Sequence, residues 1–395
     1  MGRSAIALVA CACARAATLE VRLEGGHLVV AHKDAIYEVA PSHDVYSCSW
    51  ADLSSIKGGA TIDQIERAIE PASVLSFYHH ISLYMCNSDV RPDRAHAAGE
   101  PFDCLVRPTF SGCERQLFTW GAGMERFEMP PGTGFILPRL AILQVHVKHP
   151  SLDGEPIEVA ASLSGLRLRL SAPDVKPFQY FQLGPHFGML SVPPRAPRYK
   201  VGAVCAESCI RQALRQAKVE FFEVIAIRQH MHLLGSAAVT ELIHADGSTE
   251  NYGLVRNFSA YNTPISFLPT PLYIRAGDAL QVTCVYNSSA RAHATMLGVS
   301  MHDEMCFSFM IMHPPLPNFT GCWHANENFV HIPGAPCVAI CGIIPKRQLA
   351  RQVRHKFKNG VKKFTLPRRG PWSRAALDPV YADLPDLKTC ATPDS

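Results

Sequence analysis

The chain has 395 residues, of which 47% are hydrophobic and only 18% are charged. This length allows two or three domains of ordinary size, and this composition excludes a disordered chain. Ten of the 38 basic residues lie between Lys346 and Arg369 with no acidic residue among them, so the rest of the chain is slightly acidic despite the net charge of +4. Nucleic acid is therefore not expected as a partner.

The first residues predict a signal peptide. Arg3 is followed by an apolar run from Ala5 to Ala14 and by small residues suited to cleavage after Ala14 or Ala16. We expect residues 1–16 to be removed and the protein to be secreted or to reside in the lumen of the ER or of secretory vesicles. The alternative is a truncated or wrongly started chain. No apolar run approaches the ~20 residues of a membrane span.

The fourteen cysteines support an oxidising compartment. Removal of the signal peptide takes away Cys11 and Cys13 and leaves twelve, an even number that implies up to six disulfides in an exported chain. Three glycosylation sequons, at Asn257, Asn287 and Asn318, agree with this route, although such triplets also occur by chance.

Short alternating segments, broken by proline and glycine, dominate residues 30 to 320 and predict an all-β protein. Examples are Leu140 to Val147, Glu220 to Leu234, Pro271 to Ile274 and Leu280 to Tyr286. We expect two antiparallel β-sandwich domains with jelly-roll or Greek-key connections, at residues 36–172 and 173–325. The proline-rich crossing from Ser171 to Pro197 is the expected join.

Two positions in the first predicted domain carry candidate metal-ligating histidines. His79 and His80 are neighbours, and neighbours in a regular strand face opposite sides, so a shared metal requires a strand end or a bulge. His146 lies on the mixed face of a strand whose other face is wholly apolar. By itself, His146 is better explained as a satisfied surface histidine than as a ligand.

The second predicted domain carries His230 and His232 on one strand. We expect one face to run from Phe222 through Ala226 and Arg228 to His230 and His232, because side chains two apart point the same way. A face that begins apolar and ends in Arg-x-His-x-His has entered a polar site, and two imidazoles on a rigid strand are a ready pair of metal ligands.

Met305 stands in the segment Asp303-Glu-Met-Cys306. Methionine is more often flexible core filler than a ligand. Beside several candidate histidines, however, a thioether would select copper, because Cu(I) favours soft sulfur.

The segment from residue 326 to residue 395 differs from the rest. Apolar residues recur at helical spacing from Leu349 to Phe364 with lysine and arginine between them, which predicts a basic amphipathic helix. We expect this helix to pack on the domain surface or to remain solvated. The alternative is peripheral attachment to an anionic membrane or glycan.

Together these pieces resemble the copper type II ascorbate-dependent monooxygenases, a family that includes dopamine β-hydroxylase, its MOXD-type relatives and the peptidylglycine hydroxylase. The matching stretches occur in the family's order and span roughly residues 40 to 325. They are Tyr46-Ser-Cys48, His79-His80-Ile-Ser-Leu-Tyr-Met-Cys86, Leu143-Gln-Val-His146, His230-Met-His232-Leu-Leu-Gly235, Cys284-Val-Tyr-Asn287 and Asp303-Glu-Met-Cys306.

The resemblance implies two copper ions, ascorbate as the electron donor and O2 as a co-substrate. It implies that His79, His80 and His146 hold an electron-storing copper. It further implies that His230, His232 and Met305 hold the catalytic copper, which binds O2. The implied disulfides are Cys48–Cys104, Cys86–Cys113, Cys205–Cys322 and Cys284–Cys306, which leaves the pairing of Cys209, Cys337, Cys341 and Cys390 open.

Within the family, the chain is most similar to the dopamine β-hydroxylase and MOXD branch, through Cys205-Ala-Glu-Ser-Cys209 and Leu163-Ser-Gly-Leu-Arg-Leu. We therefore expect hydroxylation of a small aryl-alkyl amine. Phe307 and Phe309 would provide an apolar wall for its ring, with Tyr46 as a further substrate contact.

Two alternatives remain. The first alternative is a peptidylglycine α-hydroxylating activity, because Arg228 stands where the amidating enzymes keep an arginine for a substrate carboxylate. Arg228 would have a purely structural role instead if it formed a salt bridge to a nearby acid. The second alternative is a non-catalytic copper-binding paralogue.

Overall fold

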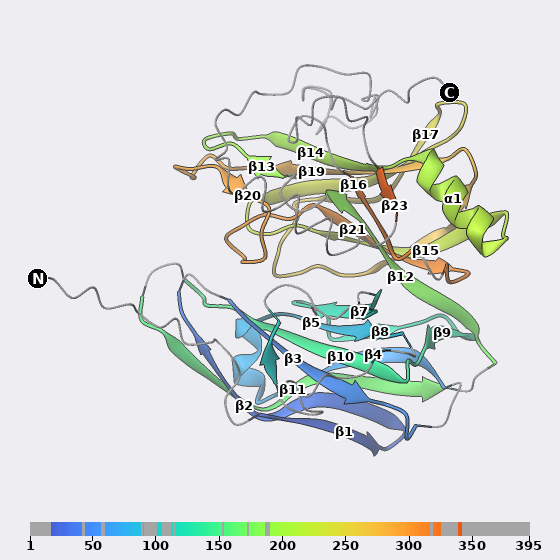
Figure 1. The fold of residues 1–395 in the computed structure, drawn as a ribbon. Helices are drawn as coiled ribbons and strands as arrows, with labels where there is room; N and C mark the ends of the chain where they lie inside the picture. Colours follow the sequence, from blue (N-terminus) through green and yellow to red (C-terminus); the bar gives the residue numbers. More distant parts are fainter. Residues whose placement is uncertain are drawn as a thin grey trace, which may run out of the picture. The chain divides into compact units, whose positions relative to one another are not determined.

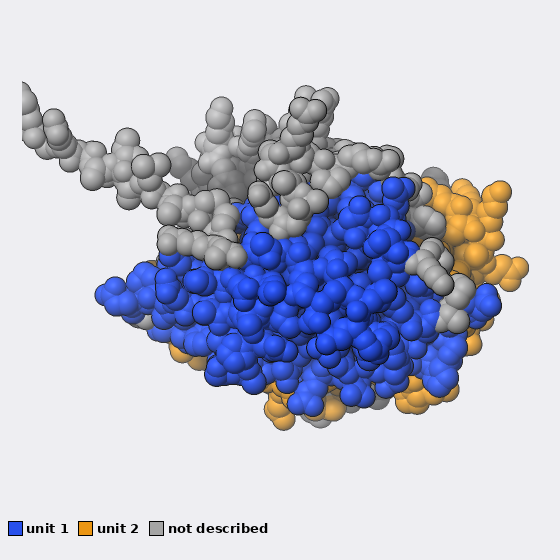
Figure 2. Space-filling model, turned by 90° about the horizontal axis from the view of Figure 1, so that it is seen from below, with its two compact units in different colours: residues 1–175 blue, residues 176–395 orange. Residues whose placement is uncertain are grey.

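The computed structural model describes residues 17–41, 44–56, 60–87, 90, 101–104, 112–113, 115–151, 154–171, 174–185, 190–316, 319–324 and 339–341. The chain divides into two compact units, Met1–Val175 and Lys176–Ser395, coloured separately in Figure 2. The predicted signal peptide, the predicted basic helix and Asn318 lie outside the described residues. Where the structure describes the chain, no helix has the length and apolar character needed to cross a membrane.

The described residues of unit 1 form strands and one short 3-10 helix (Figure 1). Its elements are β1 (Thr18–Glu24), β2 (His27–Val39), β3 (Val45–Asp52), β4 (Thr61–Glu70), η1 (Ala72–Phe77), β5 (Tyr78–Met85), β6 (Phe102–Asp103), β7 (Arg115–Gly121), β8 (Arg126–Glu128), β9 (Thr133–Ile136), β10 (Leu140–Val147) and β11 (Ile157–Ser171).

Two antiparallel sheets form the sandwich of unit 1. One has the order β1-β2-β11-β4-β9, with β8 also paired to β4, and the other has the order β6-β3-β10-β5-β7. Buried side chains of the two sheets meet between them; Tyr37 of β2 lies edge-on to Tyr78 of β5, with 6.3 Å between ring centroids. The strand predicted from Leu140 to Val147 is β10, and both of its faces are buried from Ala141 to Val147, not only the apolar one.

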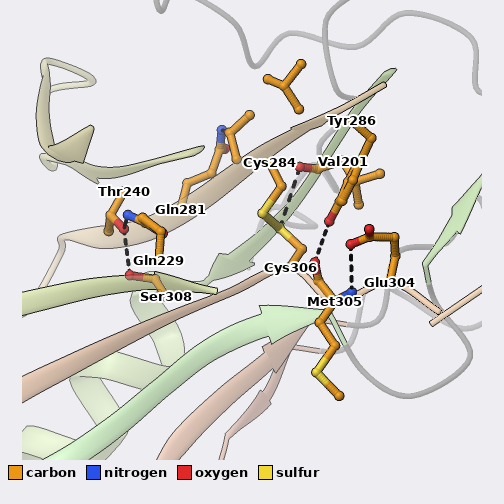
Figure 3. The surroundings of a disulfide bond; sticks show 12 residues. Val201, Gln229, Thr240, Gln281, Cys284, Tyr286, Glu304, Met305, Cys306 and Ser308 are labelled. Atoms are coloured by element: carbon orange, nitrogen blue, oxygen red, sulfur yellow. Dashed lines mark hydrogen bonds between the residues drawn. A yellow bond between two sulfur atoms is a disulfide. The ribbon is translucent and has the colours of Figure 1, made fainter. Parts of the chain in front are cut away.

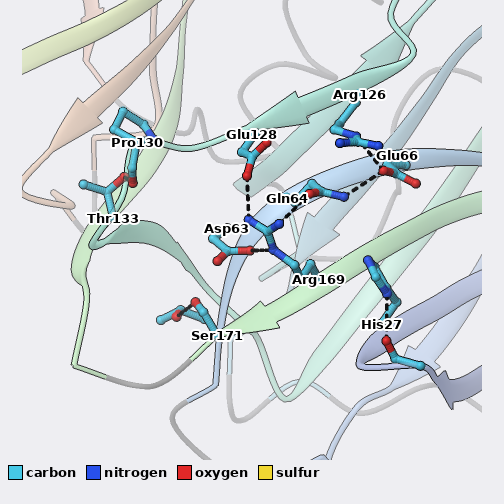
Figure 4. A network of polar contacts seen from close by, with 12 residues as sticks. His27, Asp63, Gln64, Glu66, Arg126, Glu128, Pro130, Thr133, Arg169 and Ser171 are labelled. Atoms are coloured by element: carbon cyan, nitrogen blue, oxygen red, sulfur yellow. Dashed lines mark hydrogen bonds and ion pairs between the residues drawn. The ribbon is translucent and has the colours of Figure 1, made fainter.

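Polar side chains tie the outer part of the first sheet together (Figure 4). Arg169 of β11 donates hydrogen bonds to Asp63 at 2.7 Å, to Gln64 at 2.7 Å and to Glu128 at 2.8 Å. These partners come from β4 and β8, so one guanidinium group links three strands at the exposed side of unit 1.

Unit 2 contains the remaining strands and an α-helix (Figure 1). Its elements are β12 (Lys176–Pro185), β13 (Ser191–Val192), β14 (Tyr199–Cys205), α1 (Glu207–Ala217), β15 (Phe221–His230), β16 (Gly235–Ile243), β17 (Thr249–Arg256), β18 (Ser266–Arg275), β19 (Ala279–Tyr286), β20 (Thr295–Met296), β21 (Phe307–His313), β22 (Gly321–His324) and β23 (Ala339–Cys341).

The sandwich of unit 2 places the order β12-β21-β15-β18 against the order β14-β19-β16-β17. Its core contains side chains of both sheets and of α1, including Phe222, Val282 and Ile210. The all-β prediction is confirmed, with two differences. Helix α1 was not predicted, although Ile210, Ala213 and Leu214 have helical spacing, and β22 pairs parallel to β12.

Four disulfides confirm the implied pairings: Cys48–Cys104, Cys86–Cys113, Cys205–Cys322 and Cys284–Cys306. Each of these joins residues of a single unit. Cys209 is also disulfide-bonded. Cys337 and Cys390 lie outside the described residues, and Cys341 is described only as part of β23.

Candidate metal centres

A bulge in β5 accounts for the two adjacent histidines of unit 1. β5 pairs antiparallel with β10, with His80 opposite His146 and Tyr78 opposite Val147, so His79 is an extra residue on β5. In a regular strand the two histidines would face opposite sides, and an extra residue breaks that alternation. The irregularity that a shared site requires is therefore present.

The three histidines of unit 1 point their Nδ1 atoms at one another. Nδ1 of His146 lies 2.9 Å from Nδ1 of His79 and 3.3 Å from Nδ1 of His80. Imidazole nitrogens bonded to one metal at about 2.0–2.1 Å are about 2.9–3.4 Å apart when the bond angle is about 90–110°. The spacing of the three rings therefore fits a single metal ion.

Acceptors behind two of the rings fix which nitrogen faces the centre. Nε2 of His146 lies 2.9 Å from Oδ2 of Asp44, and Nε2 of His80 lies 3.4 Å from Oε1 of Gln144. A carboxylate or amide oxygen accepts only, so each Nε2 carries the hydrogen and each Nδ1 keeps its lone pair. Gln144 precedes His146 by two residues on β10 and so shares its face.

His146 is fully buried, so the interpretation of this residue as a surface histidine is wrong. Burial lowers the pKa of His146, while the hydrogen bond to Asp44 acts in the opposite direction. The ring is therefore neutral at neutral pH, and neutral imidazole is the form that binds metals.

Tyr46 lies on this centre. It stands opposite His146 in the pairing of β3 with β10, and the two rings stack with 4.0 Å between centroids and 23° between planes. Tyr46 is 4% exposed. In unit 1 its ring thus supports the ring of His146.

In unit 2, His230 ends β15 and His232 follows two residues later. Both are buried, with ring centroids 5.2 Å apart and ring planes at 89°. Nδ1 of His232 lies 3.2 Å from the carbonyl oxygen of Asp303. Since a carbonyl oxygen only accepts, Nδ1 carries the hydrogen and Nε2 is left as the nitrogen with a metal-binding lone pair.

The prediction of one unbroken face along this strand is wrong. β15 has a bulge between Val224 and Ala226, where Ile225 is the extra residue. Phe222 and Val224 belong to the core between the sheets, and after the bulge Ile227 and Met231 take that role. The bulge thus turns Arg228, His230 and His232 onto the opposite face from Phe222 and Val224.

Met305 lies two residues before the start of β21, and its backbone is held by hydrogen bonds (Figure 3). Its carbonyl oxygen accepts a hydrogen bond of 2.6 Å from the hydroxyl group of Tyr286, and the next residue, Cys306, is bonded to Cys284. Its half-buried side chain is directed away from that disulfide in Figure 3.

Glu304 connects the Met305 segment with the histidine segment. It is fully buried, and its carboxylate accepts hydrogen bonds from the backbone N–H groups of His232, Leu234 and Met305 at 3.0, 2.6 and 3.2 Å. Burial raises the pKa of this carboxyl group to about 7, and the three N–H groups oppose the rise.

Aromatic rings extend from His230 across β21. The ring centroids of His230 and Phe309 are 5.7 Å apart, and Phe309 stacks at 5.3 Å on Tyr180 and at 6.0 Å on Phe307. Gly184 makes room for the Phe307 ring, because a Cβ atom there would lie 2.1 Å from Phe307 Cδ1.

Arg228 lies beside these rings, opposite Phe309 in the pairing of β15 with β21. It is 3% exposed and donates a hydrogen bond of 2.7 Å to Oγ1 of Thr263. Burial lowers its pKa, but a guanidinium group stays charged in proteins. A buried cation thus lies on the same strand as the two histidines.

Sequence reasoning missed several residues around these centres. Gln144 and Glu304 stand inside the quoted motifs, next to the candidate ligands, and that position was their only signal. Asp44, Thr263 and Tyr180 gave none, because each approaches from another segment of the chain.

Comparison with known proteins agrees with this arrangement. The profile of the copper type II ascorbate-dependent monooxygenase N-terminal domain matches residues 32–153, and that of the C-terminal domain matches residues 181–331. The human DBH-like monooxygenase protein 1 is 27% identical over 255 residues, which cover 62% of this chain and 41% of that protein.

Human dopamine β-hydroxylase is 26% identical over 245 residues, which cover 60% of this chain and 38% of that protein. The chain thus spans less than half the length of these curated relatives. Because the two domain profiles together match more than half of the chain, it belongs to the copper type II ascorbate-dependent monooxygenase family.

Proposed function

We propose that this protein binds two copper ions and, with ascorbate and O2, hydroxylates a C–H bond of a small aryl-alkyl amine. Copper in these sites would supply the electron transfer that places one oxygen atom in the product and releases the other as water, with ascorbate as the source of electrons. The convergence of three Nδ1 atoms at 2.9 and 3.3 Å in unit 1 is the observation that carries the proposal.

In this proposal, unit 1 binds the electron-storing copper through His79, His80 and His146. Each offers an imidazole nitrogen, and Asp44 and Gln144 hold the rings of His146 and His80 in the orientation that binding needs. A site of three imidazoles suits copper, zinc or iron.

Unit 2 binds the catalytic copper through His230, His232 and Met305. A thioether beside two imidazoles favours Cu(I) over zinc, because Cu(I) prefers soft sulfur. The mixed donor set therefore supports copper as the metal of this family member.

The rings next to His230 support an aromatic substrate. The ring of Phe309 is nearly parallel to those of Phe307 and Tyr180, and a stacked set of rings favours a flat apolar group over a peptide end. Arg228 favours the second candidate, an α-hydroxylating activity on a peptidylglycine, because a buried guanidinium group can hold a carboxylate.

We further propose that the protein is a secreted or vesicular glycoprotein. Disulfides in both units support the oxidising compartment, and Asn257 and Asn287 are exposed, as glycosylation requires. Peripheral contact of the basic tail with a membrane or glycan belongs to the same proposal.

Ascorbate-driven O2 uptake by the copper-loaded protein, screened across phenylethylamines and peptidylglycines, tests the function. We expect copper-dependent uptake and a hydroxylated product with the amines. Turnover of peptidylglycines alone would establish the second candidate, and no turnover with both coppers bound would indicate a non-catalytic paralogue.

A further inference from the structure

We propose that Glu304 is a positioning residue that holds the His232 segment and the Met305 segment in the geometry which the copper of unit 2 requires. This inference rests on the proposed function, because it assumes that His230, His232 and Met305 bind the metal. It assigns a task to a residue that does not itself need to touch the metal.

The contacts of the carboxylate carry the inference. Oε2 accepts from the N–H groups of both His232 and Met305, at 3.0 and 3.2 Å, so one oxygen atom links the two candidate ligand residues. Oε1 accepts from the N–H group of Leu234 at 2.6 Å and so holds the turn that follows His232. Two ligand segments 73 positions apart in the sequence are thereby tied to one side chain.

The backbone of Glu304 is itself fixed, so the carboxylate is a fixed reference point. Its N–H group donates to the carbonyl oxygen of Met296 at 2.9 Å, and its carbonyl oxygen accepts from Gly298 at 3.2 Å. The side chain is fully buried, so water does not compete for the three N–H groups. Tyr286 and the Cys284–Cys306 disulfide hold the Met305 segment to β19, whereas Glu304 ties it directly to the amide of a histidine ligand.

The chemistry of the three donors requires a carboxylate. Every partner is an N–H group, and a carboxylate offers only acceptors. A glutamine of the same shape would place an NH2 group against one or two of those donors, and the segment would have to move. Because outer contacts of this kind typically change metal affinity by about 10- to 100-fold, that movement is measurable.

The test compares Glu304→Gln with Glu241→Gln in the full-length, copper-loaded protein. Glu241 is a matched control: it is a buried glutamate of unit 2 whose carboxylate accepts hydrogen bonds from Gln281 and Thr283 on β19. X-ray absorption of the ascorbate-reduced protein reports copper–sulfur scattering from Met305, and competition with a Cu(I) chelator gives the affinity of each copper.

We expect Glu304→Gln to lose the copper–sulfur scattering and to bind the copper of unit 2 about 10- to 100-fold more weakly. The copper of unit 1 should stay as in the parent protein and shows that the variant is folded. Glu241→Gln should match the parent in both measurements. Glu304→Asp keeps the charge but cannot reach all three donors, so it should show a smaller loss of the same kind and serves as the test if Glu304→Gln fails to fold.

Unchanged scattering and affinity in Glu304→Gln, or in Glu304→Asp where only that variant folds, would overturn the role of Glu304 and leave the proposed function intact. Equal losses in Glu241→Gln would overturn it too, since any buried glutamate would then have the same effect. Absence of copper–sulfur scattering in the parent protein would instead remove Met305 from the proposed site, and the inference with it.

Discussion

At the scale of single residues, the candidate centres draw on two effects, the burial of an imidazole ring and an acceptor that orients it. His146 shows both effects, because burial keeps its ring neutral and Asp44 fixes its Nε2–H. Met305 differs from His146, because it is its backbone that is held. Both the N–H group and the carbonyl group of Met305 form hydrogen bonds, while its side chain is only half-buried. The residues that set the chemistry are thus few, and each can be changed alone.

Met305→Leu separates the sulfur from the volume of the side chain. Because leucine has a similar size, unfolding should become easier by less than ~1.5 kcal/mol, while copper binding at His230 and His232 weakens and most hydroxylation is lost. Copper analysis and turnover check this, with Met310→Leu in the buried core as the control. Near-full turnover with both coppers bound in Met305→Leu would mean that Met305 is core filler.

Arg228→Ala distinguishes a substrate contact from a structural one. If the guanidinium group holds a substrate carboxylate, KM should rise about 10- to 100-fold for acids and little for amines, because only the acids lose a charged partner. Arg228→Lys keeps the charge and should recover part of the loss. Equal effects on acids and amines would show that Arg228 acts through Thr263 and the packing around it.

His32 predicts acid sensitivity that does not involve the metal centres. It is fully buried between Tyr37 and Ser49, and burial lowers its pKa from 6.5 to about 3. The unfolded chain therefore binds a proton that the folded chain does not, and the free energy of unfolding falls as pH drops from about 6.5 to about 3, by up to about 1.4 kcal/mol per pH unit.

Urea unfolding of the metal-free protein between pH 7 and pH 4.5 measures this effect. His32→Gln should make the free energy of unfolding less dependent on pH, whereas His27→Gln, at the start of the same strand, should keep the parent dependence. The same pH dependence in His32→Gln and in the parent would contradict the prediction.

At the scale of elements, bulges decide what the histidines can do. The bulge at His79 in β5 brings two neighbours to one centre, and the bulge at Ile225 in β15 turns His230 and His232 away from the core face. Without the first bulge, His79 and His80 would point to opposite sides of the sheet.

His146→Ala tests the centre that β5 and β10 build. The parent protein should contain two coppers, and this variant should lose the copper of unit 1 and keep the other, as metal analysis will show. His149→Ala is the control, since this buried histidine lies close behind β10 and its ring nitrogens face the backbone of Ser151 and Glu155. One metal in the parent, or zinc, would contradict the two-copper proposal.

At the scale of the whole molecule, we expect one disulfide to contribute mainly to the stability of the fold and another mainly to the geometry of a candidate metal site. Cys205–Cys322 closes a loop with a sequence separation of 117, and Cys284–Cys306 closes one of 22 next to Met305. Chain entropy predicts that the longer loop stabilises the fold by about 5 kcal/mol and the shorter loop by about 3 kcal/mol.

Each cysteine pair can be replaced by alanine, and we expect the variant that loses more stability to be the one that loses less copper. The Cys205→Ala/Cys322→Ala variant should lose more stability in denaturant unfolding, and the Cys284→Ala/Cys306→Ala variant should lose more copper from unit 2. If copper loss followed stability in both variants, Cys306 would have no special role beside Met305.

Sequence alone determined the class of the fold and the candidate ligands, and its resemblance to a known family implied four of the disulfide pairs. Alternation along β10 and β19 marks strands because side chains two apart share a face, and short motifs around His79, His230 and Met305 carry enough specific residues to indicate the family. Helix α1 was missed because the amphipathic pattern of a single short helix is a weak signal in a sequence dominated by strands.

Only the tertiary structure decided how those residues work together. A bulge is a property of two paired strands. The sequence therefore left open whether a strand end or a bulge lets His79 and His80 share a centre, and it did not indicate the turned face after Val224. Asp44 and Glu304 reach their histidines across 102 and 72 positions of sequence, and no local pattern encodes such a contact. The sequence names the candidate ligands, and packing between distant strands sets their geometry.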